Sequence, residues 1–185
     1  MKTATDILRT EHDAILRMLD LAEDSAHRLR AGENVPPEVL NGLLEFLKLF
    51  ADRCHHGKEE DLLFPLLEKK GLLRERGPIG VMLYEHDLGR KLIGQMSRAA
   101  EAYAAGSSAA GRDWAEPAAQ YTQLLREHIY KENNILFVMA ERMLTAEEQA
   151  ELSRQFERVE EEKMGAGTHE RLHALMDRLL ATMSH

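Results

Sequence analysis

Histidine and glutamate recur at matched positions in two parts of the chain. In each part a lone histidine is followed, well downstream, by a His-x-x-x-Glu pair with an apolar run behind it. The six residues are His12, His55 and Glu59 in the first copy, and His86, His128 and Glu132 in the second. Imidazole and carboxylate groups at repeated spacing are typical metal ligands, so the repeat predicts a duplicated metal site.

The spacing within each pair indicates how the ligands would meet. Residues four apart on an α-helix lie one turn apart on nearly the same face, so both members of a pair can hold one metal centre. Apolar residues continue each pair, which places the polar side chains on a core-facing stripe: Leu62, Leu63, Ile135 and Leu136. Buried imidazoles and carboxylates without partners would be costly, and metal binding removes that cost.

The ligand types favour particular metals. Nitrogen and oxygen donors without thiolate suit iron or manganese, and six ligands exceed the four of a structural zinc site. We therefore expect two ions, each held by two histidines and bridged by both glutamates. A bridging oxo or hydroxo group would add a fifth donor, leaving each octahedral ion one open position for dioxygen, nitric oxide or peroxide.

Helical periodicity predicts the elements that position these ligands. Thr5 and Asp6 can cap a first helix that carries His12 and ends at Ala31-Gly32. Pro36 and Pro37 suit the first turn of a second helix, which continues past Glu59.

A third helix is expected from Gly77-Pro78 to about Gly106, and it carries His86. Asp113-x-x-Glu116 resembles a capping box for a fourth helix running to about Met143. Four long helices with short links predict an all-α fold, an antiparallel up-and-down four-helix bundle over residues 1–144.

Residues 145–185 are expected to form a helical extension packed on this bundle. Thr145-x-x-Glu148 is a capping signal for one helix, and Thr168 can cap another. The second helix contains His169-Glu170-x-x-His173, which spells a zinc-protease signature. Too few residues follow it to supply a third ligand, so we interpret it as a packing or exposed helix.

Composition narrows the classes of function. The 185 residues fit one domain, and the net charge of −8 with scattered Lys and Arg argues against nucleic-acid binding. No apolar stretch is long enough for a signal peptide or membrane span. Cys54 is the only cysteine, which fits a reducing compartment and a small buried thiol. We therefore expect a cytoplasmic protein, whereas the oligomeric state is not indicated.

At these residues the sequence resembles the hemerythrin-like family of HHE cation-binding domains over residues 5–143. The shared features are the lone histidines, both His-x-x-x-Glu pairs and Leu63-Phe64-Pro65. The resemblance implies a non-haem di-iron centre in a four-helix bundle, with manganese or zinc as alternative occupants on purification. Family roles include oxygen binding, iron or oxygen sensing, and nitric-oxide-linked repair of iron centres.

Two positions depart from oxygen-carrying hemerythrins. Those proteins have a further histidine where this chain has Arg90, and an aspartate five residues after the last histidine, where this chain has Glu132 at four. The two-glutamate pattern is more similar to the sensor and repair branches.

Several neighbouring residues leave alternatives. His56 and Glu60 offer a second register beside His55 and Glu59, although the second copy favours the first register. Lys58 and Lys131 each precede a glutamate and are expected to be solvated flanking residues.

Two further side chains lie on the histidine-bearing faces. Arg90 is expected in a surface salt bridge, with contact to an anion or open metal position as the alternative. Tyr121 is expected in the core, with an outer hydroxyl contact to the metal centre as the alternative.

Three functions follow from a di-iron centre. The first is a binding module that senses or stores a small diatomic ligand or takes part in iron-centre repair. The second is a redox enzyme that turns over peroxide or nitric oxide with an external reductant. The third is an iron store or donor.

Overall fold

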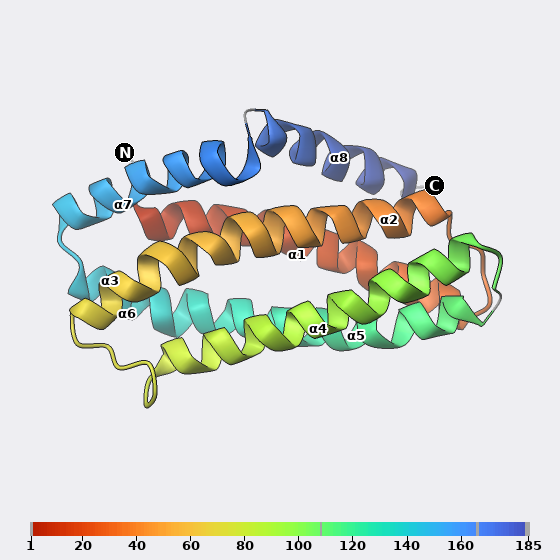
Figure 1. Ribbon diagram of the computed structural model, residues 1–185, viewed down its shortest axis with the longest axis horizontal. Coiled ribbons are helices and arrows are strands. Elements are labelled where there is room, and N and C mark those ends of the chain that lie inside the picture. Colours follow the sequence, from red (N-terminus) through yellow and green to blue (C-terminus); the bar gives the residue numbers. More distant parts are fainter. Residues whose placement is uncertain (1, 108, 166, 184–185) are drawn as a thin grey trace.

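The computed structural model describes residues 2–107, 109–165 and 167–183, and within these ranges every regular element is helical (Figure 1). The α-helices are α1 (Ala4–Arg30), α2 (Pro37–Phe46), α3 (Phe64–Lys69), α4 (Pro78–Ala104), α5 (Ala110–Lys131), α6 (Phe137–Met143), α7 (Ala146–Val159) and α8 (Thr168–Met183). Wider, π-helical segments are η1 (Leu47–His56), η2 (Glu59–Leu63), η3 (Glu132–Leu136) and η4 (Glu160–Met164).

Four long helical stretches lie side by side along the long axis (Figure 1). They are α1, the stretch from α2 through η1 and η2 to α3, α4, and the stretch from α5 through η3 to α6. Helix α5 packs against α1 and α4, and α2 packs against α4. The all-helical class predicted from the sequence is confirmed.

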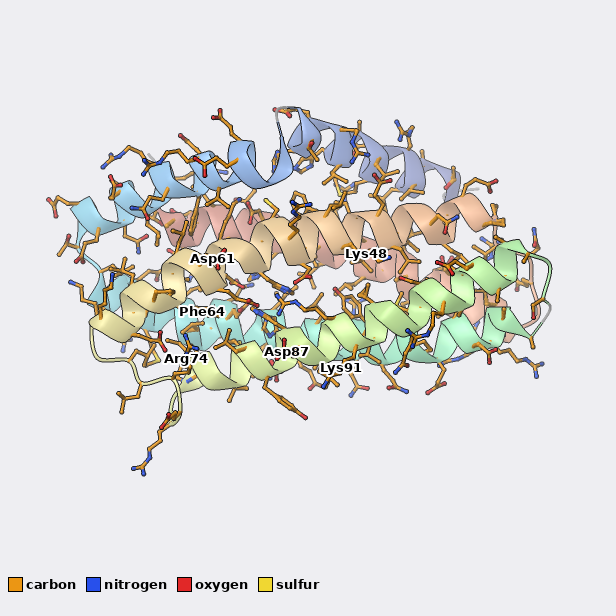
Figure 2. All side chains as sticks on the ribbon, in the orientation of Figure 1. Lys48, Asp61, Phe64, Arg74, Asp87 and Lys91 are labelled. Atoms are coloured by element: carbon orange, nitrogen blue, oxygen red, sulfur yellow. The ribbon has the colours of Figure 1, made fainter. Side chains whose placement is uncertain are left out.

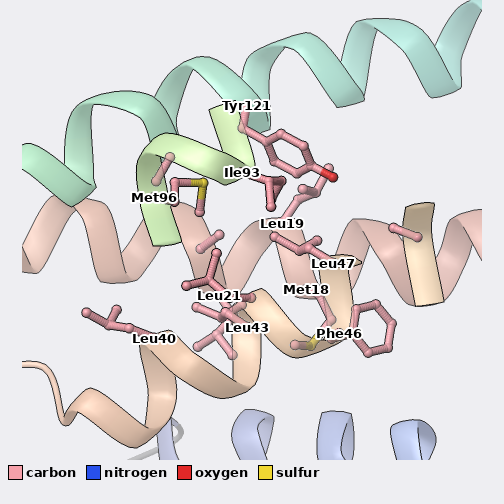
Figure 3. Packing of buried hydrophobic residues seen from close by; sticks show 14 of the residues in the cluster. Met18, Leu19, Leu21, Leu40, Leu43, Phe46, Leu47, Ile93, Met96 and Tyr121 are labelled. Atoms are coloured by element: carbon pink, nitrogen blue, oxygen red, sulfur yellow. The ribbon is translucent and has the colours of Figure 1, made fainter. Parts of the chain in front are cut away.

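Two hydrophobic clusters fill this bundle, one on each side of the histidines. The larger cluster contains Met18, Leu43 and Phe46 (Figure 3), and the smaller contains Phe64 and Phe137. Along each long stretch the metal-ligand candidates fall between residues of the two clusters. The fold therefore positions a polar belt between two apolar regions.

The apolar residues that follow the two glutamates differ in exposure. Leu63 and Leu136 are fully buried in the smaller cluster, and Leu62 packs against it. Ile135 is 48% exposed, so its prediction as a core-facing residue was wrong. A π-helical turn begins at Glu132, and it changes which of the following side chains point inward.

Two predicted helix starts were wrong. Helix α1 begins at Ala4, where Thr3 rather than Thr5 forms a capping box with Asp6. Helix α5 begins at Ala110, so Asp113 lies in its first turn and does not cap it. At α1 the cap is formed by a threonine two residues earlier than expected, and at α5 the N-cap residue is Ala109 and no side chain caps the helix.

The C-terminal helices lie along one side of the bundle (Figure 1). Helix α7 begins with the predicted capping box between Thr145 and Glu148, and it packs against α1 and η2. Helix α8 packs on α2, where a Cβ atom at Gly42 would lie 2.9 Å from a methyl carbon of Leu179. Gly42 thus permits the close approach of α8.

Within the described residues, none of the helices combines the length and the apolar character needed to cross a membrane.

Candidate metal centre

Seven buried side chains converge between the two hydrophobic clusters, and none of them is more than 4% exposed. They come from four long stretches: His12 from α1, His55, His56 and Glu59 from η1 and η2, His86 from α4, and His128 and Glu132 from α5 and η3. All six residues singled out from the sequence are among them. His56 is the seventh.

These side chains form two groups of potential ligands. In each group the ligand atoms lie within 4.8 Å of one another, and Glu59 belongs to both. One group is His12, His55, Glu59 and Glu132, and the other is His56, Glu59, His86 and His128. Two adjoining groups that share a carboxylate are suited to a pair of metal ions.

Both glutamates span the two groups. One carboxylate oxygen of Glu59 lies 3.6 Å from Nε2 of His55, and the other lies 3.5 Å from Nε2 of His86. The oxygens of Glu132 lie 3.1 Å from Nε2 of His12 and 3.2 Å from Nε2 of His128. Each carboxylate is therefore placed to bridge two ions.

The inward-facing atoms fit a metal. Within the described part of the chain, Nε2 of His12 and His55 and both carboxylate oxygens of Glu59 and Glu132 are buried without a hydrogen-bond partner. Such atoms are costly in an apolar interior, and a coordinated cation satisfies all of them at once. This is the strongest structural indication of metal binding.

The outward-facing nitrogen of every histidine in the centre has an oxygen partner. The Nδ1 pairs are His12 with Asn133 (2.8 Å), His55 with Glu11 (2.8 Å), His56 with Asp52 (3.3 Å), His86 with Glu60 (2.6 Å) and His128 with Glu85 (2.9 Å). A hydrogen bond donated by Nδ1–H leaves Nε2 unprotonated and facing the centre. This arrangement is typical of histidines that bind metals.

The sequence offered His55 with Glu59 or His56 with Glu60 as the ligand pair, and the structure uses residues from both. His55 and His56 both point into the centre, whereas Glu59 points inward and Glu60 accepts the hydrogen bond of His86. Both histidines lie in the π-helical segment η1, where a turn holds more residues and successive side chains diverge less than on an α-helix. Segments η2 and η3 begin at Glu59 and Glu132, the equivalent positions of the repeat.

The pKa shifts of the buried glutamates and histidines also favour a bound cation. Burial and the neighbouring Glu132 carboxylate raise the pKa of Glu59 well above its ordinary value. Burial and the neighbouring His86 lower the pKa of His56, which favours the neutral imidazole that metals bind. Burial would lower the pKa of His128, but the Glu132 carboxylate outweighs it and raises that pKa to about 9, so Glu132 stays ionised and Glu59 is the carboxyl that takes up a proton. A metal cation between the two carboxylates would favour ionisation of both.

A lysine lies behind each half of the centre. Lys58 is wholly buried and forms ion pairs with Glu11 on α1 and Glu160 on η4. Its prediction as a solvated flanking residue was therefore wrong. Lys131 is 31% exposed and pairs with Glu85, so it is only partly solvated.

The sequence carried a signal for these pairs. A glutamate precedes each lone histidine, so the repeat includes Glu11 and Glu85 as well as the two lysines. Glu11 and Glu85 each accept bonds from a histidine and a lysine on another helix. For Glu11, burial alone would raise the pKa, but the bond from His55 and the Lys58 charge outweigh it and lower the pKa to about 2.

Arg90 and Tyr121 have the positions expected from the sequence. Arg90 forms salt bridges with Asp52 (2.8 Å), Glu60 (2.7 Å) and Asp87 (3.1 Å). Since Asp52 and Glu60 are the partners of His56 and His86, Arg90 also braces that side of the centre. Tyr121 is 2% exposed and packs in the larger cluster (Figure 3).

A small pocket reaches the centre from the surface beside α4. Its volume is about 110 Å³. The lining residues are Lys48, Asp52, His56, Glu85, His86, Gly89, Arg90, Ile93, Tyr121 and Leu125. Figure 2 shows nitrogen- and oxygen-bearing side chains gathered between the stretch that carries Asp61 and the stretch that carries Asp87. The pocket is large enough for a molecule of a few atoms.

The His-Glu-x-x-His segment lies on α8, and its two histidines belong to neither of the two groups of potential ligands in the centre. The rings of His169 and His173 are 4.6 Å apart and pack on Phe50, with centroid distances of 5.5 and 5.4 Å. Glu170 is exposed. These contacts fit a packing helix.

The fold and the site together define a class: helical-bundle proteins whose interior binds metal cations through histidine and glutamate. The family model for the hemerythrin HHE cation binding domain matches residues 3–140, which is most of the chain. The chain belongs to this family, as its resemblance had indicated.

Two relatives come from mycobacteria. An uncharacterised protein of Mycobacterium tuberculosis and one of Mycobacterium bovis are each 28% identical to this chain over 163 residues. The match covers 88% of this chain and 63% of each relative, so the chain spans less than two thirds of their length. No solved structure matches the chain.

Proposed function

We propose that this protein holds two iron ions through His12, His55, His56, Glu59, His86, His128 and Glu132, and binds a small ligand there. The observation that carries this proposal is the set of buried inward-facing atoms without a hydrogen-bond partner among the described residues. Manganese and zinc are the alternative occupants. The donor set is nitrogen and oxygen without thiolate, which favours iron or manganese over a structural zinc ion.

The single cysteine takes no part in this site. Cys54 is 1% exposed, and burial raises the pKa of its thiol to about 12. The thiolate that would bind a metal is therefore strongly disfavoured.

The donor count differs between the two ions. If both glutamates bridge, the ion beside His12 and His55 has four protein donors, and the ion beside His56, His86 and His128 has five. This count replaces the expectation of two histidines per ion. An octahedral ion with fewer protein donors keeps more positions for outside ligands, so the small ligand is assigned to the His12–His55 ion.

Iron, when bound, supplies a change of redox state together with affinity for dioxygen, nitric oxide or peroxide. The chain's own residues supply the surroundings. The outer carboxylates fix the imidazole orientations, and the two hydrophobic clusters keep bulk water from the centre. The small pocket leads from the surface to His56 and His86, on the side of the five-donor ion, so a ligand for the His12–His55 ion would have to cross the centre between the two ion positions. An opening of this kind supports ligand binding over simple iron storage.

The role is proposed to be sensing, storage of the small ligand or repair of iron centres. Turnover of peroxide or nitric oxide is the second candidate, because the same pocket admits a substrate as readily as a ligand. That candidate needs an external reductant. The proposal also includes three expectations from the sequence. The four helices run antiparallel, the bundle ends near residue 144 where the C-terminal extension begins, and the protein is cytoplasmic.

Rapid mixing separates these functions. The protein loaded with ferrous iron should contain close to two irons per chain. Mixed with dioxygen, nitric oxide or peroxide in a stopped-flow spectrophotometer, it should give a stable adduct that reverses when the ligand is removed. Sustained consumption of the ligand with added reductant would instead establish an enzyme. Failure to bind two ions would contradict the proposal.

A further inference from the structure

The two lysines behind the metal centre differ in what surrounds them. Lys58 contacts Glu11 and Glu160, and its ammonium group lies 5.8 Å from the centre of the Phe156 ring. Lys131 pairs with Glu85, and no second carboxylate is paired with it in the ranges that the structure describes. The additional partner of Lys58 comes from the C-terminal helices, because Glu160 begins η4 directly after α7.

The contacts form a continuous chain from the C-terminal helices to a metal-ligand candidate. Glu160 pairs with Lys58, Lys58 pairs with one oxygen of Glu11, and the other oxygen of Glu11 accepts the Nδ1 hydrogen bond of His55 at 2.8 Å. Nε2 of His55 faces the centre. Lys58 is wholly buried and Glu11 is 6% exposed, so solvent does little to screen these charges.

We propose that Glu160 is a positioning residue for the metal centre, acting through Lys58 and Glu11 to strengthen His55 as a ligand. This inference rests on the proposed di-iron function, because His55 belongs to the ion that was assigned the outside ligand. The C-terminal helices thereby influence the ligand-binding ion, whereas the other ion has no such link within the described residues.

The physical reason is competition for the charge of Glu11. A carboxylate that accepts a hydrogen bond from a metal-bound imidazole makes that imidazole a stronger ligand. An ammonium group paired with Glu11 alone would draw its negative charge away from His55. Glu160 shares the ammonium group, so Glu11 keeps more of its charge for His55. The coupling is reciprocal: a metal on His55 also favours the docked position of Glu160.

A separate metal ion is a weaker explanation of the same residues. Ligand atoms of Glu11, Glu160 and His169 lie within 4.8 Å of one another, which is close enough for a cation site. However, the Lys58 ammonium group already contacts both carboxylates. The Lys58 side chain therefore supplies the positive charge that a metal ion would supply here. The cluster links α1, Lys58 and η4 through ion pairs.

The test compares two neutralising substitutions on the same π-helical segment. Glu160→Gln removes the charge that faces Lys58, and Glu162→Gln removes an exposed charge as a control. Full-length proteins loaded with two ferrous ions are mixed with an iron chelator, and release is followed by absorbance. Because the ions have different donor counts, release should occur in two phases.

We expect Glu160→Gln to accelerate the faster phase by about 3- to 10-fold and to leave the slower phase unchanged. Loss of a direct outer partner costs roughly 10- to 100-fold in metal affinity, and Glu160 acts one contact further out. Glu162→Gln should release iron like the unmodified protein, and Glu160→Asp should restore most of the slow release. Iron loading should also slow amide hydrogen exchange in α7.

Each outcome decides a separate point. If the unmodified protein fails to bind two irons, the proposed function fails. If two irons bind but Glu160→Gln behaves like Glu162→Gln, the positioning role is wrong and the di-iron function stands. Equal acceleration of both phases would indicate general loosening of the fold and would also overturn the positioning role.

Discussion

The two halves of the metal centre have the same parts and different surroundings. In both halves a glutamate beside the lone histidine accepts bonds from a histidine and a lysine on another helix. In the first half, Lys58 is wholly buried and pairs with Glu160 from the C-terminal helices. In the second half, Lys131 is 31% exposed. The comparison shows that the repeated sequence pattern determines which glutamate, histidine and lysine contact one another. Segments far along the chain determine how deeply these contacts are buried, and hence how much each contributes to stability.

The halves also differ in the number of histidines. His56 follows His55, whereas Ile129 follows His128 and packs in the larger hydrophobic cluster. One extra imidazole therefore enters the centre from the first half of the sequence and joins the group that contains His86 and His128. A near-symmetrical chain thus produces two unequal ion positions.

The shared carboxylates give the largest expected effect. Replacing Glu59 or Glu132 with Ala should reduce iron from about two per chain to less than one, because each carboxylate lies between both ligand groups. Glu60→Ala is the comparison variant: Glu60 contacts only the outer nitrogen of His86, so its loss weakens binding without removing a donor and should cost less iron than loss of either bridging carboxylate. Iron per chain after gel filtration measures the effect. Loss of one ion only would show that the carboxylates do not bridge.

The buried and exposed lysines should differ in their contribution to stability. Lys58→Met leaves Glu11 and Glu160 without their shared cation, and breaking a buried pair costs about 3–5 kcal/mol. Lys131→Met removes a partly exposed pair, for which about 1 kcal/mol or less is expected. Urea unfolding of the metal-free proteins gives both free energies. Similar losses in the two variants would contradict the difference between the halves.

The extra histidine can be removed by making the first copy resemble the second. His56→Ile should leave two ions with two histidines each and weaken binding at the His86–His128 side by about tenfold or more. Titration of the metal-free protein with ferrous iron against a competing chelator measures the two affinities. An unchanged pair of affinities would exclude His56 as a ligand.

The smallest effect is expected in the pocket beside the second group. Gly89 lines this pocket, and a Cβ atom there would lie 3.3 Å from a ring carbon of Tyr121. Gly89→Ala should therefore narrow the path and slow association of nitric oxide by about tenfold at most, with iron content unchanged. Stopped-flow association rates measure this change. An unaltered rate would mean that ligands reach the centre by another path.

The repeat was sufficient to predict which six side chains meet. His-x-x-x-Glu spacing and the paired lone histidines depend only on local helix geometry and on packing of four helices, and the structure brings all six together. Their assignment as ligands stays a prediction, as do the identities of metal and ligand. The family and the all-helical class also followed from these residues.

His56 and Lys58 were missed for different physical reasons. On an α-helix His55 and His56 point about 100° apart, so the sequence offered a choice between registers. The π-helical turn of η1 allows both to point inward. The burial of Lys58 depends on Glu160, which lies far along the chain and arrives only when α7 and η4 dock. Local periodicity contains no information on that contact.

The π-helical segments at Glu59 and Glu132 have a consequence for the length of the chain in these turns. A π turn closes its hydrogen bond over five residues instead of four, so each such turn contains one residue more than an α turn. Five residues of a π turn rotate the chain about as far as four residues of an α-helix, so the extra residue is absorbed within the turn. Deleting one residue there would restore an ordinary α-helical turn and leave Leu63 and Phe64, or Leu136 and Phe137, near their present orientation in the apolar interior. The same deletion in an α-helical part of these stretches would rotate every following side chain by about 100°. The packing beyond the two π turns should therefore tolerate a deletion within them better than a deletion in the α-helical turns nearby.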